Sequence, residues 1–193
     1  DSVFLPMQQN QANKIMAGNK DSNLVTGGAG YIGSLACVSL LQAGYQVVVL
    51  DNFCNSQPST LERVQQIAGK SLLLERCDIR DRAALDNVFN KHGISAVMHF
   101  AGLKAVGESC QQPLFYYENN VGGTINLLQA MQQVGVRRLI FSSSATVYGF
   151  PENMPVNEDT PLAAYNPYGQ TKQVIEQMLG DLCAPDMTDS WQI

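Results

Sequence analysis

The sequence has little basic charge and only two histidines, and both shortages limit what the chain can bind. Its 193 residues include 12 Lys and Arg against 17 Asp and Glu, a formal net charge of −5. This acidic excess argues against nucleic acid and against anionic membrane surfaces as general partners. We expect a structural role for His92 and His99 rather than metal ligation, so no metal site is predicted.

Long apolar runs and paired cysteines are also missing. No stretch approaches the roughly 18 apolar residues of a membrane span, and the chain does not open with the charged and apolar regions of a secretory leader. We therefore expect a cytoplasmic protein. The five cysteines are odd in number and never spaced C-x-x-C, so they indicate reduced thiols rather than disulfides or a zinc site. They are Cys37, Cys54, Cys77, Cys110 and Cys183.

The composition is that of a globular protein, with 45% hydrophobic and 15% charged residues and enough length for one domain with a full core. Residues 1–20, which are rich in Gln and Asn, are expected to form a loose extension, and residues 21–193 the folded domain. Apolar and periodic stretches place the elements along this domain. The predicted strands are 23–26, 46–50, 71–75, 96–100 and 138–141, and the predicted helices are 31–43, 61–68, 81–91, 113–133 and one beginning near 167.

The alternation of strands and helices predicts a right-handed, doubly wound α/β fold with a parallel sheet. We expect the strand order 3-2-1-4-5. The first strand is short and follows polar residues, so the pattern does not fix its beginning. Residues 191–193 stand where a sixth strand would begin.

Glycines join the first strand to the first helix. Gly27, Gly30 and Gly33 follow a G-x-x-G-x-x-G spacing, which permits a tight turn and close packing of helix on strand. The free N–H groups at the N-terminus of the helix can then bind a pyrophosphate. A glycine-rich turn without a ligand can have the same spacing, so the glycines alone leave both interpretations open.

Asp51 ends the β-branched run of the second strand. A carboxylate at this tip can accept hydrogen bonds from the ribose hydroxyls of a dinucleotide and repels a 2′-phosphate, which favours NAD over NADP. The other interpretation is that Asp51 only caps the loop that follows.

Three polar side chains form the candidate catalytic group. Tyr168 and Lys172 are four residues apart on the last predicted helix and share a face. A nearby ammonium favours the phenolate, and lowering the pKa of a tyrosine from about 10 to about 7 takes roughly 4 kcal/mol. Ser144, at the tip of the fifth strand, can bridge Tyr168 and a substrate oxygen. Tyrosine and lysine often meet at this spacing by chance, so the pair is informative only together with the glycine turn.

Six segments carry a resemblance to the extended short-chain dehydrogenase/reductase family, and within it to the nucleotide-sugar 4-epimerases. The glycine motif is shared by the whole superfamily, whereas the segment around Lys104 is more specific to the epimerases. The resemblance covers nearly all of residues 24–183. Its segments are 25–34, 51–56, 99–109, 116–121, 141–149 and 166–172.

The resemblance implies a Rossmann domain that binds NAD and epimerises UDP-glucose and UDP-galactose at C4 through a transient 4-keto sugar, a step of galactose metabolism. It implies that Ser144, Tyr168 and Lys172 are catalytic, that Ser144, Thr146 and Tyr168 contact the UDP-sugar, and that the protein is a homodimer. The residues it assigns to NAD are Gly27, Gly30, Tyr31, Ile32, Gly33, Asp51, Asn52, Asn55, Ser56, Asp78, Ile79, Phe100, Ala101, Gly102, Lys104, Asn119, Tyr168 and Lys172.

One contrast with a related group of enzymes and one departure from the family pattern bear on the reaction. The related 4,6-dehydratases carry an acidic pair after the equivalent serine, where this chain has Ala145 and Thr146, so epimerisation is favoured over elimination of water. The C-terminal part of the family, which supplies most contacts to the uridine diphosphate, is missing here. The alternatives are therefore an inactive NAD-binding fragment or an epimerase of an N-acetylated or uronic UDP-sugar.

Overall fold

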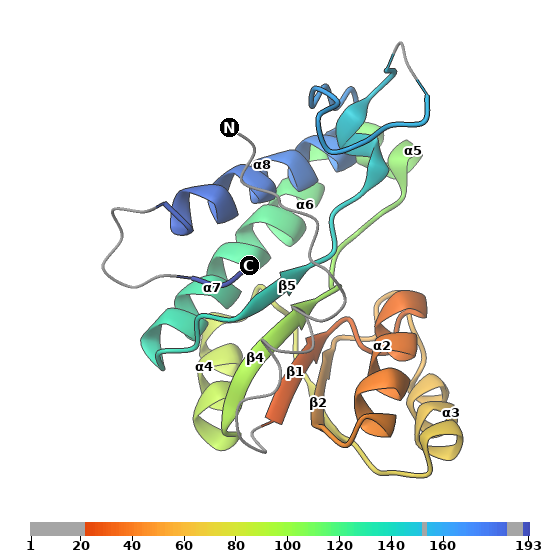
Figure 1. The fold of residues 1–193 in the computed structure, drawn as a ribbon, viewed down its shortest axis with the longest axis vertical. Helices are drawn as coiled ribbons and strands as arrows, with labels where there is room; N and C mark the ends of the chain where they lie inside the picture. Colours follow the sequence, from red (N-terminus) through yellow and green to blue (C-terminus); the bar gives the residue numbers. More distant parts are fainter. Residues whose placement is uncertain (1–21, 152–153, 185–190) are drawn as a thin grey trace.

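A five-stranded parallel sheet forms the centre of the molecule, with helices on both faces (Figure 1). The computed structural model describes residues 22–151, 154–184 and 191–193, so the extension expected at 1–20 lies outside the described residues. The strand order β3-β2-β1-β4-β5 confirms the predicted topology. The strands are β1 (Ser22–Thr26), β2 (Gln46–Asp51), β3 (Leu73–Arg76), β4 (Ile94–His99) and β5 (Leu139–Phe141).

The helices divide into two layers. In one layer α2 and α3 pack on the sheet, and in the other α4, α7 and α8 do (Figure 1). None of the helices in the described part of the chain is long and apolar enough to cross a bilayer. The helices are α2 (Tyr31–Gln42), α3 (Pro58–Ala68), α4 (Arg82–Lys91), α5 (Val106–Gln111), α6 (Pro113–Tyr116), α7 (Gly123–Gln133) and α8 (Pro167–Leu182), with the π-helix η1 (Tyr117–Gly122) and the 3₁₀-helix η2 (Ala145–Tyr148).

The central strands carry apolar side chains on both faces because helices cover both faces of the sheet. Side chains alternate between faces, so Leu24 and Val48 join the core under α4, α7 and α8, whereas Val25 and Val49 join the core under α2 and α3. All four residues are fully buried. The register pairs Leu24 with Val48 and Val25 with Val49, which places the ends of β1 and β2 at the same edge of the sheet.

Capping residues set the helix boundaries much as predicted. Asp81 accepts a hydrogen bond from the Ala84 backbone N (3.0 Å) at the start of α4, and Asn166 accepts one from Gly169 N (2.9 Å) at the start of α8. Such N-caps satisfy donors that have no partner within the helix. Gly44, with φ +94°, follows the end of α2 as expected.

The predicted helix 113–133 is present as one continuous helical stretch with those bounds, but its middle is π-helical. It is divided into α6, η1 and α7, and the short helix α5 that precedes it was not predicted. The π-helical turn allows the adjacent residues Asn119 and Asn120 both to be buried, 6% and 2% exposed. Because both residues are polar, the hydrophobic periodicity of the sequence could not indicate the π-helical turn. The sequence pattern of the helix predicted for 31–43 places Leu35 with Val38, Leu40 and Leu41 on one apolar side, but Leu35 is 55% exposed.

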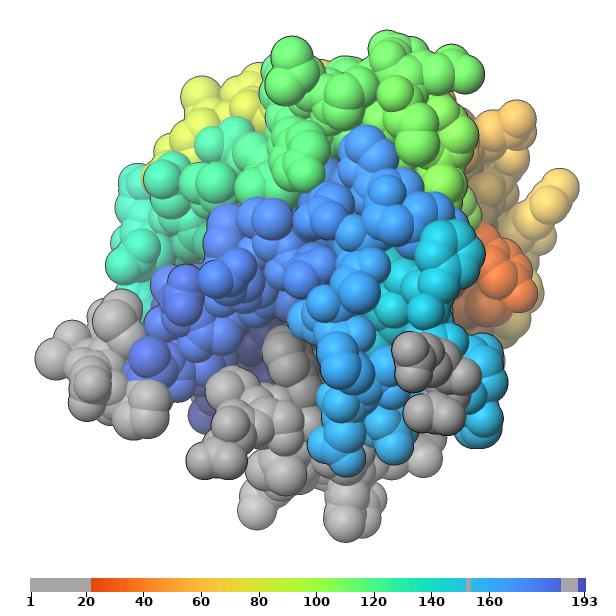
Figure 2. Space-filling model, turned by 90° about the horizontal axis from the view of Figure 1, so that it is seen from above, coloured from red at the N-terminus to blue at the C-terminus, as the bar shows by residue number. Residues whose placement is uncertain are grey.

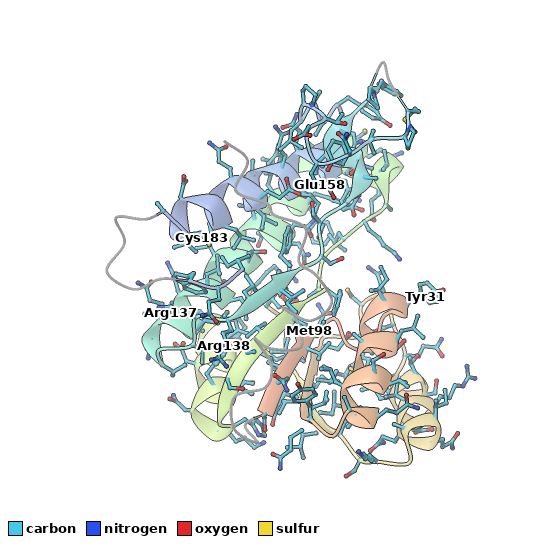
Figure 3. The ribbon with its side chains drawn as sticks, in the orientation of Figure 1. Tyr31, Met98, Arg137, Arg138, Glu158 and Cys183 are labelled. Carbon is cyan, nitrogen blue, oxygen red and sulfur yellow. The ribbon has the colours of Figure 1, made fainter. Side chains whose placement is uncertain are left out.

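Residues 191–193 lie along the outer edge of β5. Gln192 makes a parallel bridge there, donating to Arg137 O (2.8 Å) and accepting from Leu139 N (2.9 Å). The Arg137 guanidinium lies 5.3 Å from the centre of the Trp191 ring, and Figure 3 shows Arg137 and Arg138 beside this part of the chain. The sixth strand expected here is thus present as a single bridge.

Candidate active site

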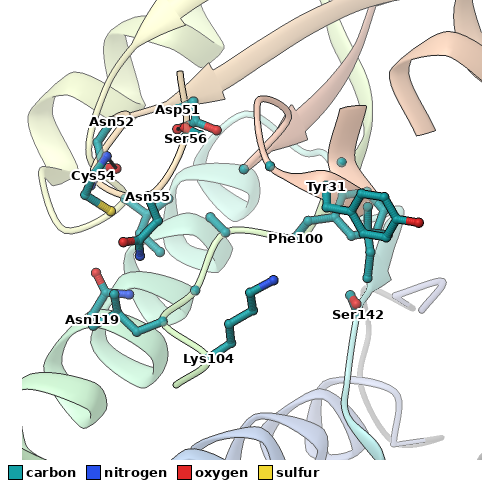
Figure 4. A pocket seen from close by; sticks show the side chains of 18 of the residues that line it. Tyr31, Asp51, Asn52, Cys54, Asn55, Ser56, Phe100, Lys104, Asn119 and Ser142 are labelled. Atoms are coloured by element: carbon teal, nitrogen blue, oxygen red, sulfur yellow. Dashed lines mark hydrogen bonds between the residues drawn. The ribbon is translucent and has the colours of Figure 1, made fainter. Parts of the chain in front are cut away.

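A cleft of about 540 Å³ lies at the carboxyl ends of the strands, where ligands bind in open α/β sheets (Figure 4). In Figure 4 the Lys104 side chain extends between Asn119 and Tyr31. Figure 2 shows the blue surface of α8 against the green surface of residues near 110, and α5 and α6 do contact α8. The predicted NAD residues that line the cleft are Gly27, Gly30, Tyr31, Ile32, Gly33, Asp51, Asn52, Asn55, Ser56, Ile79, Phe100, Ala101, Gly102, Lys104, Asn119, Tyr168 and Lys172.

The glycine turn leaves no room for side chains. A Cβ on Gly27, where φ is +68°, would lie 2.6 Å from Ala101 N, and a Cβ on Gly33 would lie 2.3 Å from Gly27 O. No side chain caps the N-terminus of α2 and its first turn holds no acidic residue. Its first N–H groups are therefore open to an anion. Tyr31, 77% exposed, stands at the rim of the cleft and points away from the sheet (Figure 3).

The Asp51 side chain connects the glycine turn to the loop that follows β2 by hydrogen bonds. Its carboxylate accepts hydrogen bonds from Ala29 N, Phe53 N and Ser56 Oγ, each 2.9 Å long. The residue is 7% exposed. Oδ2 accepts only the bond from Ala29 among the described residues, and a carboxylate oxygen has a second lone pair. Asp51 thus holds the loop, as one interpretation expected, and keeps an acceptor for the predicted ribose contact.

Asp78 is one of three predicted site residues that the structure leaves outside the lining of the cleft. Its carboxylate accepts hydrogen bonds from the Arg80 guanidinium (2.8 and 3.0 Å) and from Asn52 Nδ2 (2.9 Å). The bonds from Arg80 hold the pKa of Asp78 well below its usual range. Ile79, 4% exposed, reaches the cleft instead. Asp78 therefore orients the loop through Asn52, and its contact with NAD stays a prediction.

Ser144 and Thr146 are the other two predicted site residues that do not line the cleft. Ser144 Oγ caps η2 and accepts hydrogen bonds from Thr146 N (3.3 Å) and Thr146 Oγ1 (2.9 Å). The residues of the serine cluster that line the cleft are Ser142 and Ser143, and Ser143 donates to Glu176. The expected bridge from Ser144 to Tyr168 is not made among the described residues, so the catalytic and sugar-binding roles of Ser144 and Thr146 stay predictions.

Tyr168 and Lys172 do share one face of α8 and both line the cleft. Lys172 is 6% exposed and its Nζ donates to Ser142 O (2.8 Å). Burial lowers its pKa to about 8, although the Glu176 carboxylate opposes the change. Tyr168 is 9% exposed and packs with Leu103 and Tyr116. Within the described part of the chain its phenolic oxygen has no hydrogen-bond partner, so this oxygen can bind a ligand.

Tyr116 and Glu108 line the cleft but were not predicted. The Tyr116 hydroxyl donates to Glu108 Oε2 (2.7 Å) and accepts from Ala105 N (3.1 Å). Burial and the bond to Glu108 raise the pKa of Tyr116 to about 12, so its phenol remains protonated. The two residues lie on separate short helices on either side of Pro113, and no sequence spacing links them. The other lining residues outside the prediction are Leu50, Cys54, Cys77, Leu103, Ala105, Ser142 and Ser143.

Asn120 joins three segments beneath the cleft. Its Oδ1 accepts from Leu103 N (2.8 Å) and from Asn119 Nδ2 (2.9 Å). Its Nδ2 donates to Leu103 O (2.9 Å) and to Thr171 Oγ1 (3.1 Å). Both acceptor sites and both donors of the amide are thereby used. The side chain connects the loop after β4, the π-helix and α8, one residue from Lys172. In the sequence, the only indication of this role of Asn120 is that two adjacent asparagines, Asn119 and Asn120, occur inside a predicted helix.

His99 lies behind the cleft in a chain of buried hydrogen bonds. Thr124 Oγ1 donates its one proton to Asn120 O (2.6 Å), so it must accept from His99 Nε2 (2.9 Å). The proton of the imidazole is therefore on Nε2, and Nδ1 accepts from Thr26 Oγ1 (2.6 Å). Burial lowers the pKa of His99 to about 3. The structural role expected for this histidine is the one found.

We expect His99 to make the protein less stable in mild acid. The folded chain keeps His99 neutral down to about pH 3, whereas an unfolded chain protonates it below about pH 6.5. Because the unfolded state binds the extra proton, the free energy of unfolding should fall by about 1.4 kcal/mol per pH unit below about pH 6. Urea unfolding between pH 7 and pH 5 measures this slope. His99→Gln should remove it, and an unchanged slope in that variant would contradict the assignment.

No metal site emerges from the described residues, which contain no group of three or more His, Cys, Asp or Glu side chains suited to hold an ion. The five cysteines are unpaired. Burial raises the pKa of Cys77, on the wall of the cleft, to about 11, so it remains a thiol.

Comparison with known proteins places these features in a family. Residues 24–184 match the family model described as GDP-mannose 4,6 dehydratase. The chain is 56% identical over 170 residues to the UDP-glucose 4-epimerase of Bacillus subtilis, covering 88% of this chain and 50% of that protein. It is 55% identical to the enzyme of Mus musculus, covering 84% and 49%. The chain thus spans about half the length of the curated relatives it matches.

Solved structures agree with this similarity. The UDP-glucose 4-epimerase of Stenotrophomonas maltophila, with bound NAD and formylated UDP-arabinopyranose, superposes with a TM-score of 0.84 at 51% identity, covering 86% of this chain and 50% of that one. The Bifidobacterium longum enzyme, in complex with NAD+ and UDP, gives a TM-score of 0.83 at 48% identity with the same coverage.

Proposed function

Because the chain belongs to the GDP-mannose 4,6 dehydratase family, we propose that it carries the NAD site and catalytic residues of a nucleotide-sugar 4-epimerase. The reaction would interconvert UDP-glucose and UDP-galactose. The observation that carries the proposal is the pairing of Tyr168, whose phenolic oxygen has no partner among the described residues, with the buried ammonium of Lys172. Relatives that are more than 50% identical are named UDP-glucose 4-epimerase, which supports the same reaction.

The residues of the cleft fit NAD. The glycine turn provides a surface without side chains, which a Cβ at Gly27 or Gly33 would fill with backbone clashes. The uncapped N-terminus of α2 offers N–H groups to a pyrophosphate. Asp51 retains a lone pair for a ribose hydroxyl and disfavours a 2′-phosphate. When bound, NAD would supply the reversible oxidation that makes C4 a ketone for part of each cycle.

The chain's own residues would handle the proton. We assign Tyr168 as the general base for the 4-hydroxyl, since its oxygen is open to the cleft. Lys172 keeps a positive charge one helical turn away, and that charge favours the phenolate. Ser142 fixes the direction of the ammonium by accepting its hydrogen bond (2.8 Å). On the basis of the family resemblance, we assign Ser144 a hydrogen bond to a sugar oxygen. For this role the Ser144 hydroxyl must rotate away from Thr146, with which it forms a hydrogen bond.

The name of the matching family model points to elimination of water as a second candidate reaction. That reaction needs an acid and a base near the sugar, and the two residues after Ser144 are Ala145 and Thr146, which carry no carboxyl group. We therefore place epimerisation first. An epimerase of N-acetylated or uronic sugars and a fragment that only binds NAD are the two further candidates.

An activity assay on the longest natural reading frame that contains this chain tests the proposal. UDP-galactose should be converted to UDP-glucose without added reductant, as read by nucleotide-sugar chromatography. UDP-N-acetylglucosamine, UDP-glucuronic acid and GDP-mannose serve as competing substrates, and a 4-keto-6-deoxy product would show a dehydratase instead. Bound NAD without turnover of any of these sugars would contradict the proposed function and identify a binding remnant.

The proposal includes the cellular setting implied by the resemblance. We place the reaction in galactose metabolism, in the cytoplasm, and in a homodimer. Size-exclusion chromatography with light scattering at micromolar concentration tests the dimer directly.

A further inference from the structure

Phe141, the last residue of β5, lies against the buried ammonium of Lys172, and the proposed function gives it no role. The Lys172 Nζ atom is 4.6 Å from the centre of the Phe141 ring. Its one hydrogen bond to a described residue goes to Ser142 O, although an ammonium has three donors. The face of an aromatic ring carries partial negative charge and attracts a cation within about 6 Å, most strongly where water is excluded.

The helix that carries Lys172 supplies one opposite charge. Glu176, one turn further along α8, raises the pKa of Lys172, but burial has the larger effect and lowers it to about 8. The Glu176 carboxylate is also engaged by the Ser143 hydroxyl. Tyr168, one turn earlier, makes no hydrogen bond to Lys172. A buried ammonium with so little compensation depends on every attractive contact that remains.

The other elements around Lys172 in the described part of the chain add no negative charge. His99 of β4, which is buried and neutral, lies 5.8 Å from the Phe141 ring between ring centroids. Lys104, from the loop after β4, extends into the same cleft and is itself a cation. On the sheet side, the groups that favour the charged form of Lys172 are therefore the Phe141 ring and the Ser142 carbonyl oxygen.

We propose that Phe141 is a positioning residue for the proposed reaction: its ring face holds the Lys172 ammonium charged and directed into the cleft beside Tyr168. Phe141 does not line the cleft and acts only through Lys172. The inference rests on the proposed function for its catalytic meaning, but the contact between ring and ammonium can be tested without catalysis.

Fluorinated phenylalanines test the contact because fluorine weakens the charge of the ring face while changing its size little. Phe141 is replaced in the full-length chain by 4-fluoro-, 3,5-difluoro- and 3,4,5-trifluorophenylalanine. The titration of Lys172 is followed by NMR of ¹³Cε-labelled lysine, and the signal is assigned by its loss in Lys172→Met. We expect the Lys172 pKa to fall stepwise, by about one pH unit over the series.

The pH dependence of turnover should change in the same order as the Lys172 pKa across the three fluorinated variants. If turnover requires the charged ammonium, the high-pH limb of the rate profile moves to lower pH by the same amount as the NMR titration. Trifluorophenylalanine at Phe89 is the matched control, because that ring is 4% exposed in the core between α4 and the sheet and does not contact Lys172. The control should leave both the titration and the rate profile unchanged.

The outcomes separate the two proposals. A Lys172 titration that is equal for all four rings at position 141 would overturn the role of Phe141, even in an active epimerase. A stepwise titration with no epimerase activity in the parent protein would confirm the contact between ring and ammonium and contradict the proposed function. A stepwise titration with a rate profile that does not follow it would overturn the positioning role.

Discussion

Tyr168→Phe is expected to abolish most turnover while leaving NAD bound and the fold intact. The variant loses the phenolate that takes the proton from the sugar, and removal of a general base typically lowers rates by about 100-fold to 10,000-fold. The ring would still pack against Leu103 and Tyr116. Since the phenolic oxygen has no hydrogen-bond partner among the described residues, its removal leaves no buried donor or acceptor unpaired. The measurements are turnover of UDP-galactose and NAD retained after gel filtration.

Tyr165→Phe is the matched control. It removes the same atom from a tyrosine that is 55% exposed, stacked on Phe150 at 4.2 Å and outside the lining of the cleft. Its turnover should equal that of the parent. If Tyr168→Phe kept more than about a tenth of the parent rate, well above the range for a lost general base, the catalytic assignment would be wrong.

Gly33→Ala is expected to weaken NAD binding by about 100-fold, the loss of two charge-assisted hydrogen bonds at about 1.5 kcal/mol each. The added Cβ would lie 2.3 Å from Gly27 O and 2.9 Å from Gly28 Cα, and both contacts are backbone. The turn must therefore move away from α2, which displaces the N–H groups that would face the pyrophosphate. The forced shift should also lower the free energy of unfolding by about 1–3 kcal/mol.

Gly180→Ala provides the comparison for this change. Gly180 is a helical residue of α8, and nothing lies within 4 Å of its added Cβ. Alanine should therefore stabilise the chain by about 0.5–1 kcal/mol and leave NAD binding unchanged. Isothermal titration with NAD and urea unfolding measure both variants. Equal NAD affinity in Gly33→Ala and the parent would show that the glycine turn does not hold the cofactor.

The parts of the fold that follow from local chemistry could be predicted from the sequence. Residues 47–50 are all apolar because both sheet faces are covered, and Asp81 marks the start of α4 by its capping chemistry. The glycine spacing and the four-residue separation of Tyr168 and Lys172 identified two parts of the cleft, and the resemblance to the family supplied most of its other lining residues. These features depend on periods and spacings that a single sequence contains.

The parts that depend on tertiary partners could not be predicted. Asp78 lies outside the lining of the cleft, where its carboxylate is held by Arg80 and by Asn52 of the loop after β2. At the end of β5, only the folded backbone decides which serines face the cleft, and Ser142 and Ser143 line it where Ser144 was expected. Leu35 is exposed because α2 buries Cys37, Leu40 and Leu41 instead. Each outcome requires knowledge of a neighbour that is distant or oriented by the fold.

The π-helical turn at Tyr117–Gly122 has a consequence for how related sequences are aligned. A π-turn contains one residue more than the α-helical turn it replaces, so a homologue could lose one residue from this segment and still form a continuous helix. That deletion would rotate Asn120 by about 100° relative to α7 and separate it from Leu103 and Thr171. A one-residue gap at this point of an alignment would thus identify homologues in which Asn120 no longer connects the loop after β4 to α8 by hydrogen bonds.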